Sequence, residues 1–244
     1  MKGVILAGGL GTRLRPLTKV TNKHLLPIYD KPMIYYPIEA LCSAGIKDIM
    51  IVTGGNSAGD FLRLLGNGRE FGLKDIFYTY QEGEGGIADA LSLCEHFADR
   101  QQIVVMLGDN IVQDSIEPYI RAFEREGSGA RILLKEVADP QRFGCPEFDG
   151  DRIVRIEEKP ERPKSRYAVT GIYMYDDKVF DYCRRLTPSA RGELEITDVN
   201  NAYLEAGELR YDVLKGWWAD AGNFESLFRA GSLVAQLRRE LRQD

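Results

Sequence analysis

Short apolar runs alternate with amphipathic runs over the first half of the sequence, and this alternation limits the folds open to the chain. The apolar runs are rich in β-branched residues and predict strands at residues 3–6, 49–53, 76–80 and 103–107. The amphipathic runs predict helices at residues 34–44, 58–65, 87–97 and 116–126. Short apolar strands separated by helices are typical of a parallel sheet that is buried on both faces. We therefore expect a doubly wound α/β fold in this half.

The pattern changes after Gly129. Strand-like runs at residues 131–137, 144–148, 152–157 and 168–174 are joined by short polar connections, and Asp149-Gly150 predicts a tight hairpin turn. Apolar residues at helical spacing predict a C-terminal helix over residues 223–244. With 244 residues, 44% of them hydrophobic, the chain can bury one substantial core. We expect one mixed α/β domain: a Rossmann-like, mainly parallel sheet flanked by helices, with antiparallel strands added by the second half.

A glycine-rich loop, Gly8-Gly9-Leu10-Gly11-Thr12-Arg13, follows the first predicted strand. Glycines tolerate positive φ, so the backbone can turn tightly and point its N–H groups at an anion. Arg13 adds a planar fork of donors that matches phosphoryl oxygens. The run lacks the third glycine of a dinucleotide-binding fingerprint and the Gly-Lys-Ser/Thr ending of a P-loop. By itself it is read either as a phosphate-binding loop or as a tight turn with an exposed arginine.

The charge balance limits the partners of the chain. The net charge is −5, which argues against general binding to nucleic acid or to a membrane surface. An acidic protein that binds phosphate must gather its cations locally, and Arg13, Arg15, Lys23 and Lys159 are the candidates.

The cysteines and the start of the chain indicate its compartment. The four cysteines are scattered without a C-x-x-C pair, which predicts buried, reduced thiols rather than a metal site or disulfides. The chain starts on a predicted strand, with no signal peptide and no membrane-spanning segment. We therefore expect a cytoplasmic protein.

Asp109 follows the apolar strand at residues 103–107, in Leu107-Gly108-Asp109-Asn110. Ligands of open α/β sheets collect beyond the carboxyl ends of the strands, so Asp109 is expected to share a crevice with the glycine loop. A carboxylate beside a phosphate suggests Mg²⁺, which takes one or two carboxylates together with substrate phosphates. Asp220, in Trp218-Ala219-Asp220, would be the second carboxylate. Taken singly, each aspartate could equally be a turn or capping residue.

Motifs along nearly the whole chain resemble those of the sugar-1-phosphate nucleotidyltransferases, and most closely those of the glucose-1-phosphate thymidylyltransferases. They occur in the family's order at residues 13–18, 22–27, 30–37, 81, 107–110, 157–160, 167–171, 191–198 and 218–222. The resemblance implies transfer of a thymidylyl group from dTTP to glucose 1-phosphate, giving dTDP-glucose and pyrophosphate. Because thymine and uracil differ by one methyl group, a uridylyltransferase or another hexose-1-phosphate nucleotidyltransferase stays open as an alternative.

The resemblance also implies how the reaction is catalysed. Mg²⁺ is the expected cofactor, held by Asp109 and Asp220. The attacking oxygen of the sugar phosphate is already an anion, so in-line attack on the α-phosphate needs no general base, and catalysis rests on positioning and charge neutralisation. Arg13 and Lys23 would hold the triphosphate, and Lys159 would hold the sugar phosphate.

Two pockets are expected around these catalytic groups. The amide of Gln81 can donate and accept together, which suits the edge of thymine or uracil. Asp89 stands where longer family members often carry glutamine, and Cys145-Pro146 also departs from the family pattern. The expected nucleotide-binding residues are Leu6, Gly8, Gly9, Gly11, Thr12, Arg13, Gln81, Gly86 and Asp109. The expected sugar-phosphate residues are Gly144, Glu158, Lys159, Val169 and, as a weaker candidate, Arg191.

The organisation implied is a single nucleotidyltransferase domain. Residues 1–129 would mainly bind the nucleotide, residues 130–222 the sugar phosphate, and residues 223–244 would form a C-terminal helix. Long-form family members continue past the position of Asp244 with helices that help form a regulatory site and a tetramer interface, so we expect a homo-oligomer such as a dimer, with weaker feedback inhibition. A catalytically silent nucleotide-sugar sensor is a further alternative, but a sensor has no need of metal-binding carboxylates.

Overall fold

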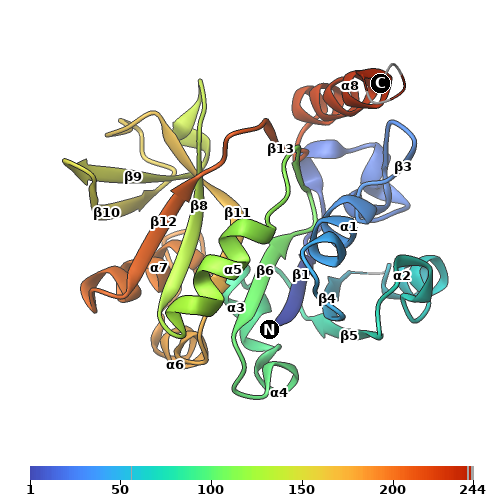
Figure 1. The fold of residues 1–244 in the computed structure, drawn as a ribbon. Helices are drawn as coiled ribbons and strands as arrows, with labels where there is room; N and C mark the ends of the chain where they lie inside the picture. Colours follow the sequence, from blue (N-terminus) through green and yellow to red (C-terminus); the bar gives the residue numbers. More distant parts are fainter. Residues whose placement is uncertain (56, 241, 243–244) are drawn as a thin grey trace.

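A seven-stranded sheet forms the centre of the computed structural model, which describes residues 1–55, 57–240 and 242 (Figure 1). The strand order is β12-β8-β11-β6-β1-β4-β5, and only β11 runs antiparallel to its neighbours. The strands are β1 (Lys2–Ala7), β4 (Asp48–Gly54), β5 (Asp75–Gln81), β6 (Ile103–Leu107), β8 (Ala130–Glu136), β11 (Tyr167–Tyr175) and β12 (Leu209–Val213). The predicted mainly parallel, mixed sheet is confirmed.

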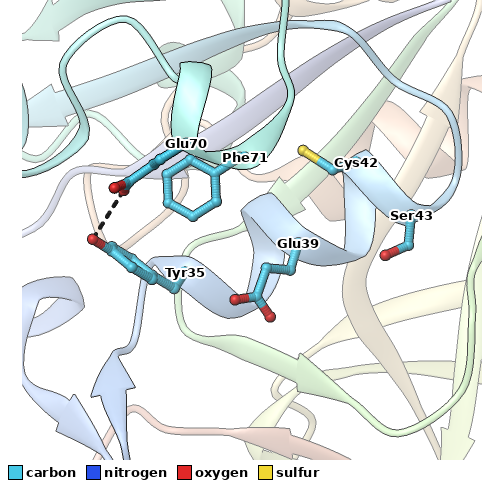
Figure 2. Close-up of a pocket in the computed structure, with 6 residues that line it drawn as sticks. All are labelled: Tyr35, Glu39, Cys42, Ser43, Glu70 and Phe71. Atoms are coloured by element: carbon cyan, nitrogen blue, oxygen red, sulfur yellow. Dashed lines mark hydrogen bonds between the residues drawn. The ribbon is translucent and has the colours of Figure 1, made fainter.

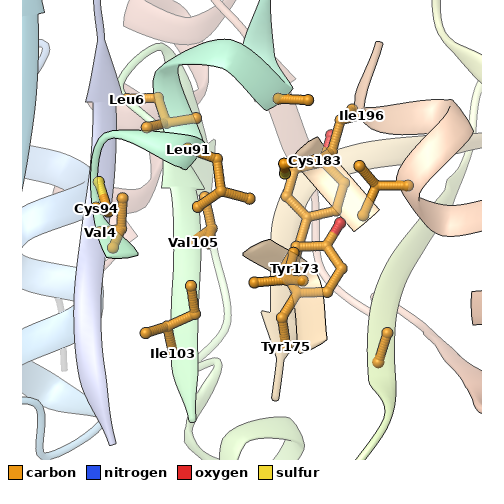
Figure 3. Packing of buried hydrophobic residues seen from close by; sticks show 14 of the residues in the cluster. Val4, Leu6, Leu91, Cys94, Ile103, Val105, Tyr173, Tyr175, Cys183 and Ile196 are labelled. Atoms are coloured by element: carbon orange, nitrogen blue, oxygen red, sulfur yellow. The ribbon is translucent and has the colours of Figure 1, made fainter. Parts of the chain in front are cut away.

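Helices cover both faces of the sheet. Because successive residues of a strand point to opposite faces, each strand contributes side chains to two cores. Val4 and Leu6 of β1 belong to the core on one face, whereas Ile5 and Ala7 belong to the core on the other. Figure 3 shows the first of these cores between the strands and α3. Continuous apolar strands are what a doubly covered sheet requires.

The helices divide between the two faces. Residues of α1, α2 and α5 enter one core, and residues of α3, α4, α6 and α7 enter the other. The helices are α1 (Tyr35–Ser43), α2 (Ala58–Leu65), α3 (Ile87–Ser92), α4 (Glu95–Ala98), α5 (Glu117–Glu126), α6 (Lys178–Arg185), α7 (Ile196–Glu205) and α8 (Phe224–Glu240). Short 3₁₀ helices are Thr12–Leu14, Leu17–Lys19, Lys23–Leu25, Arg69–Phe71 and Pro140–Arg142.

Three two-stranded sheets complete the fold. Strands β9 (Gly144–Asp149) and β10 (Arg152–Glu158) form the predicted hairpin. The other pairs are β7 (Asn110–Val112) with β13 (Trp218–Asp220), and β2 (Pro27–Ile28) with β3 (Lys31–Pro32). The antiparallel strands expected from the second half lie in two places: β11 pairs antiparallel with β6 and β8 within the central sheet, and β9 and β10 form a separate hairpin.

The helix predicted over residues 87–97 is wrong in its length, because the chain leaves the helix after Ser92. The Ser92 hydroxyl donates to the carbonyl of Asp89 at 2.6 Å, and the Cys94 N–H bonds the carbonyl of Leu91, three residues back. Both bonds compete with the regular helical pattern, so the chain turns and restarts as α4.

The predicted C-terminal helix is α8, which packs against β2 and β13 and forms a third apolar cluster with them. Of the residues 223–244 predicted for it, 241, 243 and 244 lie outside the described residues. Among the described helices, none combines the length and apolarity needed to cross a membrane. All four cysteines are free thiols, three of them buried and Cys42 half-buried.

Candidate active site

The carboxyl ends of β1, β5 and β6 border a cleft of about 690 Å³. Parallel strands bring their carboxyl ends to one edge of a sheet, where α/β proteins bind ligands. The structure brings every predicted site residue into the lining of this cleft: Leu6, Gly8, Gly9, Gly11, Thr12, Arg13, Lys23, Gln81, Gly86, Asp109, Gly144, Glu158, Lys159, Val169, Arg191 and Asp220. Arg15, also considered as a phosphate-binding cation, does not line it.

The glycine loop has the backbone conformation that its sequence predicts. Gly9 and Gly11 have φ of 87° and 59°, in the left-handed region that favours glycine. A Cβ on Gly11 would lie 3.0 Å from Thr18 and 3.1 Å from Lys23, so the close packing of the loop also favours glycine. The loop thereby places Arg13 at the cleft while Leu14 is buried beneath it.

Asp109 meets Lys23 inside the cleft. The Lys23 Nζ lies 2.5 Å from Asp109 Oδ2, and the Asn110 side chain donates to Asp109 Oδ1 at 3.1 Å. Burial alone would raise the pKa of Asp109, but the Lys23 ammonium and these hydrogen bonds hold it well below its usual range. The carboxylate is therefore ionised at any physiological pH.

Asp220 reaches the same place from the far end of the chain. Strand β13 pairs with β7 so that Asp220 is opposite Asn110, and the Ala221 N–H donates to the Asp109 carbonyl at 2.9 Å. Burial, and secondly the charge of Asp109, raise the pKa of Asp220 to about 6. Two carboxylates that share one buried site favour a cation near them.

Asn110 holds the elements that carry the two aspartates. Its Oδ1 accepts hydrogen bonds from the Gly171 N–H of β11 at 3.0 Å and from the Trp218 indole N–H of β13 at 2.6 Å. Asn110 is 2% exposed, so these donors have little access to water. One side chain thus connects β7, β11 and β13 beside Asp109.

His24 lies under the cleft but does not serve as a general base. Burial, and next the Lys23 charge, lower the pKa of His24 to about 3, so the imidazole is neutral. Its Nδ1 lies 2.7 Å from Asn22 Oδ1, which can only accept, so Nδ1 carries the proton. The ring is a packed structural group, which agrees with a reaction that needs no base.

Arg142 is a cleft residue that sequence reasoning missed. Its guanidinium Nη2 lies 3.5 Å from Asp220 Oδ2, and its Nη1 donates to Asp139 Oδ2 at 2.7 Å. Nη2 is buried and makes no hydrogen bond to any described residue. A buried donor without a partner suggests a ligand that completes it. The signal available in the sequence was its position directly before Phe143-Gly144.

The Gln81 amide differs from expectation. Its Nε2 donates to Asp89 Oδ2 at 2.6 Å and to the Gly86 carbonyl at 3.0 Å, so both N–H groups are already used. The expectation that Gln81 both donates to a base and accepts from it is therefore wrong for this structure, in which only Oε1 is left to face a ligand. Asp89, one of the positions at which the sequence departs from the family pattern, accepts one of these two N–H groups.

The second half of the chain contributes acids and cations to the other part of the cleft. The Thr197 hydroxyl donates to Glu158 Oε2 at 2.6 Å, and Glu158 Oε1 lies 3.5 Å from Lys159 Nζ. Arg191 donates to both oxygens of Glu195, at 2.9 and 2.7 Å. The ion pair of Lys159 is thus longer than that of Arg191, and about 44% of the Lys159 side chain is exposed.

A second, smaller hollow lies beside α1. Figure 2 shows its lining residues Tyr35, Glu39, Cys42, Ser43, Glu70 and Phe71. It has a volume of about 420 Å³, and none of the described residues that line it is basic. Its two carboxylates disfavour phosphate, so the cleft at the strand ends is the candidate active site.

Comparison with known proteins identifies the family of this chain. The family model described as nucleotidyl transferase matches residues 2–236. A glucose-1-phosphate thymidylyltransferase of Neisseria meningitidis is 47% identical over 238 residues, covering 96% of this chain and 82% of that protein. One from Mycolicibacterium smegmatis is 46% identical over 247 residues, covering 100% of this chain and 84% of that protein.

Solved structures show the same fold. A Bacillus anthracis structure assigned as a glucose-1-phosphate thymidylyltransferase, in complex with sucrose, is 55% identical with a TM-score of 0.92 and covers 96% of this chain and 94% of its own. A UDP-glucose pyrophosphorylase complexed with UDP-glucose is 24% identical with a TM-score of 0.86, covering 96% of this chain and 98% of its own, and shows the fold alone. By its sequence and its fold, the chain belongs to the nucleotidyl transferase family, and within it to the glucose-1-phosphate thymidylyltransferases.

Proposed function

We propose that this chain transfers a thymidylyl group from dTTP to glucose 1-phosphate, giving dTDP-glucose and pyrophosphate. The observation that carries the proposal is a single cleft that joins Arg13 and Lys23 from the first half of the chain with Lys159 from the second half, beside the carboxylates of Asp109 and Asp220. The names of its relatives support the choice of thymidylyl group and glucose.

We assign residues 1–129 mainly to the nucleotide and residues 130–222 mainly to the sugar phosphate. The assignment is supported by where the cleft groups originate. The glycine loop, Gln81 and Gly86 come from the first part, whereas Gly144 and Lys159 come from the second. A dTTP molecule bound along β1 and β5 would present its α-phosphate to a sugar phosphate held by the second part.

Asp109 and Asp220 would hold a Mg²⁺ ion. No set of three or more His, Cys, Asp or Glu side chains in residues 1–55, 57–240 and 242 is placed to hold a metal. A pair of buried carboxylates nevertheless fits Mg²⁺, which completes its shell with water and substrate phosphates. The pKa of Asp220, raised to about 6 by burial and by Asp109, supports this fit, since the charges of Lys23, Arg13 and Arg142 do not offset burial and Asp109 at this carboxyl. When bound, Mg²⁺ neutralises phosphate charge and orients the triphosphate.

The protein's own groups position the reactants. A sugar phosphate is anionic at neutral pH, so the neutral His24 is not required as a base. Arg13 and Lys23 would bind the triphosphate and stabilise the charge that grows on the departing pyrophosphate. Lys159 would bind the sugar phosphate and direct its oxygen at the α-phosphorus.

The backbone of Lys159 supports a functional role. Its φ is 45°, a left-handed conformation that costs a non-glycine residue about 1 kcal/mol. The Lys159 N–H donates to the Phe143 carbonyl at 3.0 Å, which holds the turn in place. Strained conformations of this kind cluster at active sites and ligand clamps, and of the four described non-glycine residues with positive φ only Lys159 lines the cleft.

The proposal is tested by pyrophosphate release over a grid of nucleoside triphosphates and hexose 1-phosphates with Mg²⁺. We expect the highest kcat/KM for dTTP with glucose 1-phosphate, a lower value for UTP, and loss of activity in Asp109→Asn. Binding of dTDP-glucose without pyrophosphate release from any pair would favour a sensor instead. Homo-oligomerisation stays a prediction, which light scattering can check.

A further inference from the structure

We infer that Asp89 is a positioning residue that sets base selection by fixing the Gln81 amide with its carbonyl oxygen toward the base pocket. This inference rests on the proposed function, because it concerns the nucleotide of that reaction. It predicts a site that favours a base edge with a ring N–H donor, as in thymine and uracil. A base edge with a ring acceptor, as in cytosine, is disfavoured.

The Gln81 side chain is held at its amino end and lies close to the backbone of Gly8 at its oxygen end. On the amino side, Nε2 donates to Asp89 Oδ2 at 2.6 Å and to the Gly86 carbonyl at 3.0 Å. On the oxygen side, a Cβ on Gly8 would lie 2.8 Å from Gln81 Oε1, so Gly8 permits the close approach of the oxygen. Gln81 is 5% exposed and lines the cleft. The amide therefore has little freedom to turn.

The chemistry of the two partners fixes which end of the amide faces them. An ionised carboxylate and a backbone carbonyl can only accept hydrogen bonds. Turning the amide over would place Gln81 Oε1 against both acceptors and leave Nε2 without partners, which is unfavourable in a buried site. Asparagine or glutamine at position 89 could either accept or donate, so only the Gly86 carbonyl would still favour one orientation of the amide.

Gln81 Oε1 accepts no hydrogen bond from the residues that the structure describes. It is therefore the atom that this side chain can offer to a base. Thymine and uracil present N3–H, a donor, to such an oxygen. Cytosine presents a lone pair at N3, so it would have to face oxygen with another acceptor or shift in the pocket.

A purely structural role for Asp89 must be separated from this one. Asp89 is the third residue of α3, where an acidic side chain stabilises the positive end of a helix. The chain offers a matched control: Asp60 is the third residue of α2 and pairs with the exposed Arg63 at 3.1 Å. Asp60→Asn removes the same charge from the same helical position away from the cleft.

The experiment compares kcat/KM for dTTP, UTP and dCTP in the wild type, Asp89→Asn and Asp60→Asn, with calorimetric Kd values for the three nucleotides. We expect Asp89→Asn to lower the dTTP/dCTP preference about tenfold, mainly through KM. The dTTP/UTP ratio should stay unchanged, because both bases carry N3–H. Asp60→Asn should change neither ratio.

A double-variant comparison shows whether Asp89 acts through Gln81. In a Gln81→Ala background, Asp89→Asn should leave the dTTP/dCTP ratio unaltered, because the group that it positions is gone. Should Asp89→Asn fold poorly, Gly85→Ala gives the same test, since its Cβ would lie 2.5 Å from Asp89 Oδ2 and displace the carboxylate. It should lower the ratio in the same direction.

A dTTP/dCTP ratio within twofold of the wild-type value in both Asp89→Asn and Gly85→Ala would overturn the inference. An equal effect of Asp89→Asn with and without Gln81 would do so too. Failure of the proposed function has a different signature: the wild-type protein would release no pyrophosphate from dTTP, while the calorimetric ratios would still report on Asp89.

Discussion

The ammonium of Lys23 lies 2.5 Å from the carboxylate of Asp109, although the two residues are 86 positions apart in the chain. Lys23 belongs to a 3₁₀ turn and Asp109 follows β6, so the fold of the first half creates the pair. The contact neutralises Asp109 in the protein without ligands. Substrate phosphates would compete for Lys23 and leave Asp109 free to bind a cation.

The first prediction concerns the two carboxylates. Asp109→Asn and Asp220→Asn should each lower kcat by orders of magnitude while the protein stays folded, because each removes half of one metal site. The double variant should be little worse than either single one, since one shared ion is lost. Steady-state kinetics with Mg²⁺ checks this, and Asp75→Asn, at the amino end of β5, is the control. Near-normal turnover in either single variant would contradict the assignment.

The second prediction separates the two substrates. Arg13→Ala should lower kcat strongly, because charge on the departing pyrophosphate grows toward the transition state. Arg13→Lys should recover only part of the rate, since a point charge lacks the bidentate fork. Lys159→Ala should instead raise KM for glucose 1-phosphate, with the Kd for dTTP by calorimetry little changed.

The neighbouring Arg15 supplies the control for that comparison, because it does not line the cleft. Arg15→Ala should keep both KM values near those of the wild type. Loss of dTTP binding in Lys159→Ala, with an intact KM for the sugar phosphate, would mean that the two substrate positions are reversed.

The third prediction concerns pH. The pKa of Asp220 is raised from 3.8 to about 6 by burial and by Asp109. Between these two pH values, Asp220 binds more protons in the folded protein than in the unfolded chain. The carboxyl therefore lowers the free energy of unfolding progressively as the pH rises from about 4 to 6, and the full cost remains at higher pH. Without metal, Asp220→Asn should therefore raise the free energy of unfolding at pH 8 by at most about 3 kcal/mol.

Denaturant unfolding of the wild type and Asp220→Asn at several pH values, with a chelator present, measures this effect. The gain from the substitution should shrink toward zero near pH 4. A difference between the two proteins that is the same at pH 4.5 and pH 8 would show that the Asp220 carboxyl is not the titrating group.

The fourth prediction concerns Asn110. Asn110→Ala leaves the Gly171 N–H and the Trp218 indole N–H buried without their acceptor, which should cost about 3 kcal/mol of stability. Thermal and denaturant unfolding measure the loss. Trp218→Phe removes one donor together with its need for an acceptor, so its cost should be smaller. An Asn110→Ala protein as stable as the wild type would contradict the structural role.

Several features were predictable from the sequence because they depend on neighbouring residues. The strand over residues 103–107 has the predicted bounds, since a continuous apolar run fits a sheet covered on both faces. Gly9 and Gly11 adopt the positive φ expected of a tight loop. Helix α6 was missed although its signal was present: Val179, Phe180 and Cys183 recur at helical spacing and are buried.

Other features depend on contacts with distant parts of the chain. The pattern of β8 and β11 identifies them as strands but says nothing of their partners, so their place in the central sheet was not predictable. Arg142 is a surface-like residue in the sequence, and only the fold places its guanidinium beside Asp220. The direction of the Gln81 amide follows from Asp89 on the next helix.

The sequence by itself determined the fold class, the family and most of the chemical groups of the cleft, because hydrophobic periodicity and motifs can be read directly along the chain. The tertiary structure alone decided how those residues act on one another: the Lys23–Asp109 pair, the raised pKa of Asp220 and the acceptor left on Gln81. Charge and hydrogen-bond effects depend on distance and burial, and the sequence specifies neither until the chain folds.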